Sequence, residues 1–407
     1  MTGNKSKDDS MATILGRAVT PDGIVDGGLT FEHGIITDVG SSPQNTSRVY
    51  DFGDALILPG FIDVHMHGLG RHDTFTAEDI AAVAKMQCHF GTTGFLPSVA
   101  SLSIERYLEF GRNVRAAQAA TGPDSAQIVG AHFEGPFINI QGKAGMDAAF
   151  LREIDLDECR RYIDETGDAL KLMTLSPELE GGANLVRLLC EHGIVASLGH
   201  SRATVAQMQA GVEAGLTEVC HLFNAFERNG DDPNWPWLKG PTAGLLDAIL
   251  DCEKLCCEVI CDLVHVRPKH IRLAVERLGP DRFMAITDSL PGAGLSSGEY
   301  EMVDGRRFTT ADGAARLISN GTLVGSVLTM NRAFGNLVEH CDIDPVTAAK
   351  YTSTNAARNL GLDNELGSIQ PGRRACLAVL DADHECLATF VDGNLAYSTN
   401  KHTLDED

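Results

Sequence analysis

The sequence predicts an α/β protein built on a (β/α)8 barrel, with a small β-sandwich domain contributed by both chain ends. After residue 56, short apolar runs alternate with amphipathic stretches of helical length through about eight rounds, which is typical of a parallel barrel. A doubly wound open sheet would alternate similarly, but no glycine-rich phosphate-binding fingerprint supports it. We therefore expect a barrel domain over 58–365 and a small β domain over 1–57 and 366–407.

Both chain ends carry short alternating runs broken by glycine and aspartate. The N-terminal runs are ILGRAVT, GGLTFEHGIITDVG and RVYDFG, and the C-terminal runs are ELGSIQPGRRACLAVLD and ATFVDGNLAYST. Alternation of apolar and polar residues predicts strands, and the N-terminal runs resemble a small antiparallel sheet. The simplest arrangement pairs the two ends beside the barrel.

Eight apolar runs supply the predicted barrel strands. They are LILPGFIDVH, TTGFLPSV, QIVGAHFE, ALKLMTLSPE, GIVASLGH, TEVCHLF, CEVICDLVH and RFMAITDS. Helical periodicity between them predicts helices over 77–90, 104–118, 184–193, 203–215 and 270–279, with two more over 329–341 and 344–359. Insertions after the strands account for the remaining length.

Composition limits the partners. The formal net charge of the 407 residues is -23, which disfavours nucleic acid and anionic membrane surfaces. The sequence lacks a secretory signal and a run of about 18 apolar residues, so we expect a cytoplasmic protein that keeps its 11 cysteines reduced. Cys252, Cys256, Cys257 and Cys261 could form a structural zinc site, but their spacing matches no familiar ligand pattern and we interpret them as small buried residues.

Several of the predicted strands end in a potential metal ligand. In a barrel, the ends of the strands converge at one mouth. Two residues spaced by two on a strand point to the same face, as in the H-x-H of the first run. The residues are His65 and His67 on the first run, Glu134 on the third, His200 on the fifth, His221 on the sixth and Asp288 on the eighth.

Together these residues predict a divalent metal site. Each could instead be a solvated histidine, a turn acceptor or a helix cap, but six such roles at the same ends of strands would be a coincidence. Zinc is the commonest metal for imidazole and carboxylate ligands, and it lowers the pKa of bound water. Asp288 is the candidate to accept the proton of that water and pass it to a leaving nitrogen. The predicted chemistry is hydrolysis of an amide, ester or ring imide.

The sequence resembles the N-acetylglucosamine-6-phosphate deacetylases of the amidohydrolase superfamily, in the family's order and over nearly the whole chain. The matching segments are LPGFIDVHMHG, HFEGPFIN, SLGHS, CHLFNAF, CDLVHV, ITDSLPGAGL, NGTLVGSVLTMNRAFGNLVEHC, NAARNLGL and LGSIQPG. Such a family member would hydrolyse the acetamide of N-acetylglucosamine 6-phosphate, and we expect a homodimer from the same resemblance.

The resemblance also implies roles for individual residues. Glu134, His200 and His221 would bind the main metal, His65 and His67 a second one bridged by Glu134, and Asp288 would be the catalytic acid and base at the metal centre. The implied substrate-binding positions are Gly145, Met146, Asn224, Ala225, Arg228, His265, Leu323, Val324 and Gly325.

Three departures from the family pattern leave the substrate open. Met146 stands where a histidine is expected near the acyl carbonyl. The family's arginine stretch that binds phosphate is replaced by ERNGDDPNWPWLKGPTAG, in which Arg228 and Lys239 are only approximate substitutes for the arginine. Trp235 and Trp237 of this segment could stack on a sugar or pack at an interface. Asp-Gly-x-His becomes DLVH, followed by Arg267 as another possible cation. The alternatives are therefore another N-acyl amino sugar, phosphorylated or not, and a non-catalytic scaffold that retains the fold.

Overall fold

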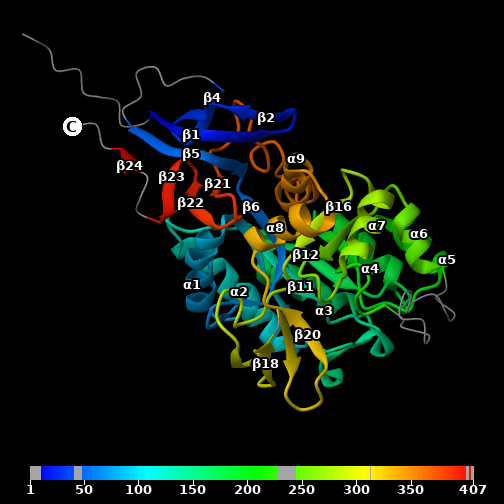
Figure 1. Cartoon of the computed structure of the whole chain (residues 1–407). Coiled ribbons are helices and arrows are strands. Elements are labelled where there is room, and N and C mark those ends of the chain that lie inside the picture. Colours follow the sequence, from blue (N-terminus) through cyan, green and yellow to red (C-terminus); the bar gives the residue numbers. More distant parts are fainter. Residues whose placement is uncertain (1–10, 41–47, 227–243, 312, 400–402, 405–407) are drawn as a thin grey trace, which may run out of the picture.

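The computed structural model describes residues 11–40, 48–226, 244–311, 313–399 and 403–404. Among these, eight parallel strands form a barrel surrounded by helices (Figure 1). The strands are β6 Phe61–Met66, β9 Thr92–Ala100, β11 Ala131–Glu134, β12 Leu170–Leu175, β13 Val195–Leu198, β14 Glu218–Val219, β15 Cys256–Ile260 and β16 Phe283–Ile286. The predicted barrel is confirmed, and each of its strands lies within one of the predicted runs or overlaps it.

Contacts between β16 and β6 close the barrel. The Asp288 N–H donates to the carbonyl of His65 at 2.9 Å, and the His67 N–H donates to the carbonyl of Ser289 at 2.7 Å. The Thr287 hydroxyl adds a bond of 2.6 Å to the buried carboxyl of Asp63. These bonds bring the ends of the first and last strands together, which places His65 and His67 opposite Asp288.

The helices follow the strands and pack their apolar faces on the barrel. They are α1 Ala77–Gln87, α2 Ile104–Ala120, α3 Leu156–Thr166, α4 Gly182–Glu191, α5 Val205–Ala214, α6 Leu245–Asp251, α7 Pro268–Leu278, α8 Met330–Cys341, α9 Pro345–Ala349 and α10 Asn355–Asn359. Short helical turns lie at Cys88–Phe90, Ile140–Gly142, Ala148–Phe150 and Gly167–Ala169, and a π-helical turn, Lys350–Thr354, joins α9 to α10. Within the described residues, no helix is both long enough and apolar enough to cross a membrane.

Strands from both chain ends form the small β domain. Its strands are β1 Met11–Thr20, β2 Gly23–Asp26, β3 Leu29–Glu32, β4 Ile35–Val39, β5 Arg48–Pro59, β21 Leu377–Leu380, β22 Cys386–Val391, β23 Asn394–Ser398 and β24 Thr403–Leu404. They hydrogen-bond into one mixed sheet with its own apolar core, and the blue and red strands lie side by side in Figure 1. The predicted pairing of the two ends is present, but β1 and β5 run parallel, so the N-terminal part is not purely antiparallel. The exact domain boundaries stay a prediction.

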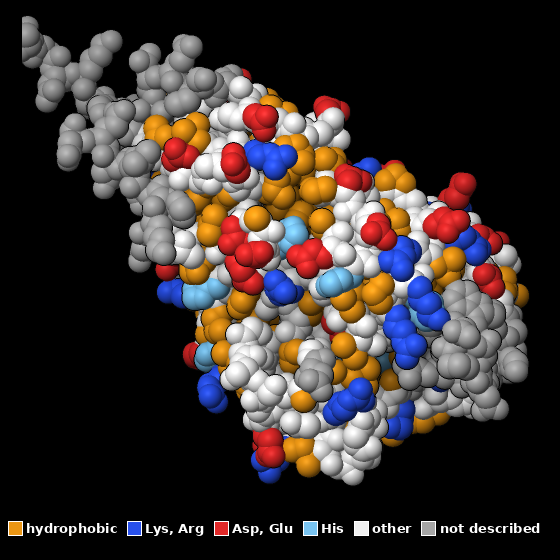
Figure 2. Space-filling model, in the orientation of Figure 1, with side chains coloured by type: hydrophobic (Ala, Val, Ile, Leu, Met, Phe, Trp, Pro, Cys, Tyr) orange, Lys and Arg blue, Asp and Glu red, His pale blue; other side chains and the backbone are white. Residues whose placement is uncertain are grey.

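A four-stranded antiparallel sheet lies between β16 and α8. It consists of β17 Gly298–Glu301, β18 Arg307–Ala311, β19 Ala314–Leu317 and β20 Leu323–Ser326, and we call it the flap. A short β7–β8 pair, Gly68–Leu69 with His72–Asp73, also follows a barrel strand. On the face shown in Figure 2, acidic and basic side chains both occur, so this face carries charges of either sign despite the negative total.

Candidate metal centre and substrate pocket

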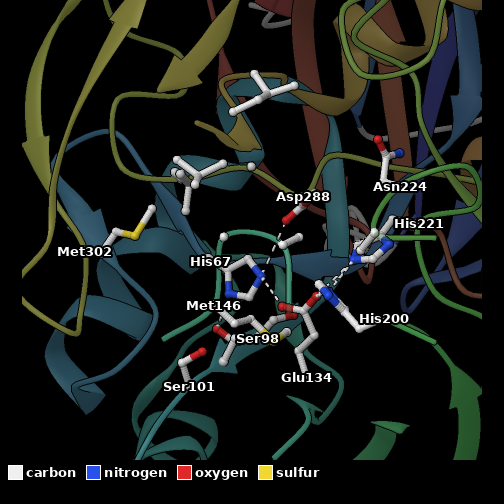
Figure 3. A pocket seen from close by; sticks show the side chains of 18 of the residues that line it. His67, Ser98, Ser101, Glu134, Met146, His200, His221, Asn224, Asp288 and Met302 are labelled. Atoms are coloured by element: carbon white, nitrogen blue, oxygen red, sulfur yellow. Dashed lines mark hydrogen bonds and ion pairs between the residues drawn. The ribbon is translucent and has the colours of Figure 1, made fainter. Parts of the chain in front are cut away.

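Glu134, at the end of β11, lies at the centre of the predicted ligand cluster. Its Oε1 atom lies 2.9 Å from His200 Nε2 and 3.0 Å from His221 Nε2. Its Oε2 atom faces the other pair of histidines, 3.3 Å from His67 Nε2 and 3.7 Å from His65 Nε2. Figure 3 shows Glu134 between His67 on one side and His200 and His221 on the other. The carboxylate thus presents one oxygen to each pair.

Asp288 completes the cluster from the last barrel strand. Its Oδ1 atom lies 3.5 Å from His67 Nε2 and 3.7 Å from His65 Nε2. Its side chain is 12% exposed, and it lines the pocket described below. All six predicted ligands therefore meet at one place, although their individual roles remain predictions.

Hydrogen bonds on the far sides of the imidazole rings fix which nitrogen carries a hydrogen. His200 Nδ1 lies 2.9 Å from the carbonyl oxygen of Gly142, and His67 Nδ1 lies 3.1 Å from that of Ser98. A carbonyl can only accept, so each Nδ1 is the donor, and Nε2 is the atom of each ring that faces Glu134. A cation, either a proton or a metal ion, must therefore lie between each Nε2 atom and the carboxylate oxygen that it faces.

The donor set fits a divalent metal ion. Buried imidazole nitrogens and carboxylate oxygens are ligands of zinc and its neighbours in the first transition row. His65, His67 and Glu134 offer one group of closely spaced ligand atoms, and Glu134 and His221 form a second group together with Cys220. The site is thus of the kind typical of metal-dependent amidohydrolases.

The charges of the cluster keep Glu134 ionised. Burial opposes ionisation, but the charge of His65 and the hydrogen bonds from His200 and His221 outweigh it and hold the pKa of Glu134 well below its usual range. Next to His65, burial lowers the pKa of His132 well below its usual value, so this ring is neutral. The rings of His65 and His132 meet edge to face, with centroids 4.5 Å apart.

Several residues of the cluster have left-handed backbone conformations. The φ angles are 50° at His200, 26° at His221 and 48° at Asp288. Such angles are uncommon outside glycine and tend to occur at functional sites. Gly325 of β20 packs directly against this turn, where a Cβ atom would lie 2.8 Å from the carbonyl oxygen of Asp288. A side chain at this position would therefore push the flap away from the catalytic aspartate candidate.

Comparisons with known proteins agree with this geometry. The model of the amidohydrolase family matches residues 56–402. The N-acetylglucosamine-6-phosphate deacetylase of Bacillus subtilis (strain 168) is 31% identical over 350 residues, which cover 84% of this chain and 85% of that protein. The chain belongs to the N-acetylglucosamine-6-phosphate deacetylase family of amidohydrolases. The resemblance predicted from its motifs is confirmed.

Other relatives of the enzyme extend the comparison. The N-acetylgalactosamine-6-phosphate deacetylase of Escherichia coli O157:H7 is 30% identical over 343 residues, which cover 84% of this chain and 88% of that protein. A variant deacetylase from Mycobacterium smegmatis, in complex with N-acetyl-D-glucosamine-6-phosphate, has a TM-score of 0.85 at 27% identity and covers 96% of this chain and 99% of its own. Membership of this family makes the chain an amidohydrolase, which disfavours the scaffold alternative.

A pocket of about 600 Å³ opens beside the cluster of this amidohydrolase. Figure 3 shows Met146 and Met302 on the same side of the cluster as His67, with Asn224 on the side of His221. Most of the predicted substrate-binding residues line this pocket, namely Gly145, Met146, Asn224, Ala225, His265, Leu323, Val324 and Gly325. The predicted contact Arg228 lies outside the described residues, as do Trp235, Trp237 and Lys239.

Two arginines that were not predicted from the sequence also line the pocket. Arg202 follows His200 by two residues, and its guanidinium donates to the carbonyl oxygens of Ser201, Ala225 and Gln141 at 2.7–2.9 Å. Its place two residues after a strand-ending histidine was the signal that could have identified it. Arg306 belongs to the flap, where no strand had been predicted.

Arg267, by contrast, is the N-cap residue of α7 and is not among the lining residues. The cationic role that its sequence position suggested therefore has no support in the described pocket. Its neighbour His265 does line the pocket and is held by Asp262, with 2.6 Å between Nδ1 and Oδ2.

Proposed function

We propose that the enzyme removes the acetyl group from N-acetylglucosamine 6-phosphate, giving glucosamine 6-phosphate and acetate. The observation that carries this proposal is the convergence of four imidazole Nε2 atoms on the two oxygens of Glu134, beside a pocket that Asp288 also faces. The names and the bound sugar phosphate of the relatives support the substrate class.

Zn²⁺ is the metal we propose for this centre, where it would polarise the acyl carbonyl and make water acidic enough to be deprotonated near neutral pH. His200, His221 and Glu134 would hold one ion, and His65, His67 and the second oxygen of Glu134 would hold another. A carboxylate with one oxygen on each side is suited to bridging two cations.

Asp288 is the proposed acid and base. Its carboxylate reaches both the histidine pair and the pocket, so it can accept a proton from the attacking water and donate it to the sugar nitrogen as the amide bond breaks. Because the amine leaves poorly as an anion, this second proton transfer is required for the products to separate.

The groups that line the pocket suit the proposed substrate. Asn224, Ala225, His265 and Arg202 bring amide, imidazole and guanidinium groups that can donate to a phosphate. Met146 and Met302 line the same pocket and offer apolar contacts to the acyl methyl group. With methionine at position 146, carbonyl polarisation would depend on the metal alone. The homodimer expected from the family stays a prediction.

The substrate is tested by comparing kcat/KM for N-acetylglucosamine 6-phosphate, N-acetylgalactosamine 6-phosphate and unphosphorylated N-acetylglucosamine. The proposal expects the first to be preferred, and loss of the phosphate to lower kcat/KM at least a hundredfold, as for a missing charge-assisted contact of about 3 kcal/mol. A preference for the galactosamine epimer would favour the second candidate, which the Escherichia coli relative supports. Equal turnover of the unphosphorylated sugar would contradict the phosphate assignment.

A further inference from the structure

Three polar side chains lie beneath the metal centre, inside the barrel and away from the pocket lining. Glu218 lies on β14, Cys220 directly after it, and Glu258 on β15, and each is fully buried. Carboxyl groups are rarely buried to this degree unless a specific partner compensates the loss of hydration. The partners of Glu258 are two of the predicted metal ligands.

A single oxygen of Glu258 contacts both sides of the metal centre. Glu258 Oε2 accepts from the imidazole of His65, whose Nδ1 is 3.0 Å away, and from the backbone N–H of His221 at 3.1 Å. The Glu258 carbonyl oxygen accepts from the Leu222 N–H at 2.7 Å, so β15 fixes the chain on either side of His221 as well. His65 and His221 belong to different halves of the cluster, and Glu258 is thus a common anchor.

The bond to His65 determines the hydrogen on that ring. A carboxylate oxygen accepts, so Nδ1 of His65 must donate, and Nε2 is the atom left to face Glu134 and Asp288 and to bind a metal ion. The Cys220 thiol lies 3.6 Å from the same Nδ1 atom, farther away than Glu258 Oε2.

Glu218 is a second buried carboxyl group in the same layer as Glu258. Glu218 Oε1 and Glu258 Oε1 are both buried and have no hydrogen-bond partner in the described structure. Two buried carboxyl groups that lie close together disfavour each other's ionisation. Burial and the charge of Glu258 raise the pKa of Glu218 well above its usual range, and Asn359 of α10 donates to its other oxygen.

We propose that Glu258 is a positioning residue of the metal centre, which orients His65 and the backbone of His221 through one carboxylate oxygen. The inference rests on the metal dependence in the proposed function and not on the identity of the substrate. Carboxylate partners of metal-binding histidines commonly contribute tenfold to a hundredfold to metal affinity.

The test compares two glutamine variants of equal size and burial on neighbouring strands. Glu258→Gln removes the anion that anchors the histidines, and we expect the affinity for Zn²⁺ to fall about tenfold to a hundredfold. Glu218→Gln keeps the size of a buried carboxyl whose hydrogen bond is with Asn359 and not with a histidine of the cluster, so we expect an affinity within about threefold of the unchanged protein. The measurement is competition for Zn²⁺ against a chromophoric chelator, with folding checked by circular dichroism.

Equal affinity of both variants and the unchanged protein would overturn the proposal, and so would an equal loss in both folded variants. Nitrogen-15 NMR of the unchanged, zinc-loaded protein gives a second readout that does not depend on any variant folding. The proposal requires the hydrogen of metal-bound His65 on Nδ1, and a hydrogen on Nε2 would contradict it. Neither measurement uses a sugar, so failure here is distinct from failure of the proposed substrate.

Discussion

Asp288 combines contact with the histidine cluster and access to the pocket. Changing Asp288→Asn keeps the size of the side chain but removes its ability to accept a proton. We expect kcat for deacetylation to fall about 100-fold to 10,000-fold, the usual contribution of a general acid or base. Steady-state kinetics, with metal content measured on the same samples, check this expectation. A kcat within tenfold of the unchanged enzyme, at full metal content, would show that another group carries the proton.

At the scale of residues, the sequence predicted the cluster but not what lies around it. His65, His67, Glu134, His200, His221 and Asp288 could be grouped because the ends of parallel strands converge at one mouth. Glu258 and Arg202 could not be assigned roles, because a contact depends on rotamers and on neighbouring strands. An acidic residue inside an apolar strand run, as at Glu218 and Glu258, was nevertheless a signal of a buried polar layer.

The flap contributes residues to the lining of the pocket. Arg306, just before β18, donates to the carbonyl oxygen of Gly145 and pairs with Asp304, with 2.7 Å between Nε and Oδ2. Both Arg306 and Gly145 line the pocket, so these bonds connect the flap to the loop that carries Met146.

Changing Arg306→Ala should therefore loosen the flap over the substrate. We expect KM to rise about tenfold, which corresponds to about 1.4 kcal/mol of lost binding, with a smaller change in kcat. Arg307→Ala is the matched control, because this neighbouring arginine is exposed and pairs with Glu299 on the flap's own surface. An equal rise of KM in both variants would argue against the contact with Gly145.

Helix α3, which packs on the barrel, allows the contribution of a helix N-cap to the stability of the fold to be measured. Its N-cap residue Asp155 accepts hydrogen bonds from the backbone N–H groups of Asp157 and Glu158 at 2.9 and 3.2 Å. We expect Asp155→Ala to lower the free energy of unfolding by about 1 kcal/mol, while Asp164→Ala, at an exposed position of the same helix, changes it by less than about 0.5 kcal/mol. Urea denaturation of the two variants makes the comparison, and equal midpoints would contradict the capping role.

The elements that the sequence did not predict include ones with few apolar residues and the short apolar helix α6. Helix α3 is dominated by charged residues, and each flap strand is only four or five residues long, with exposed and buried positions alternating in β18. The barrel strands were predicted because they are buried on both faces and read as continuous apolar runs. The direction of β1 relative to β5 was wrong because pairing between distant segments leaves no local pattern.

For the whole molecule, the bound metal should couple the barrel strands. His65 lies on β6, Glu134 on β11, and His200 and His221 follow β13 and β14, so one ion would hold segments that are far apart in the sequence. A ligand that binds only the folded state stabilises it by about 4 kcal/mol when present at a thousand times its Kd.

Removing the metal with a chelator should thus lower the thermal unfolding midpoint by several degrees, and added Zn²⁺ should restore it. Differential scanning calorimetry with and without chelator makes this measurement. Chelator already saturated with Zn²⁺ is the control for effects of the chelator itself. An unchanged midpoint after the metal has been removed would mean that the cluster does not bind an ion tightly.

The central claim is that the Glu134 cluster holds a divalent metal that is needed for hydrolysis of an N-acetyl amino sugar phosphate. Its most direct test is a titration of the metal-free protein with Zn²⁺, following acetate release from N-acetylglucosamine 6-phosphate. Our account predicts that activity is absent at the start and rises in proportion to bound metal until one or two ions per chain are reached. Full activity of the metal-free protein, or no acetate release at full metal occupancy, would contradict it.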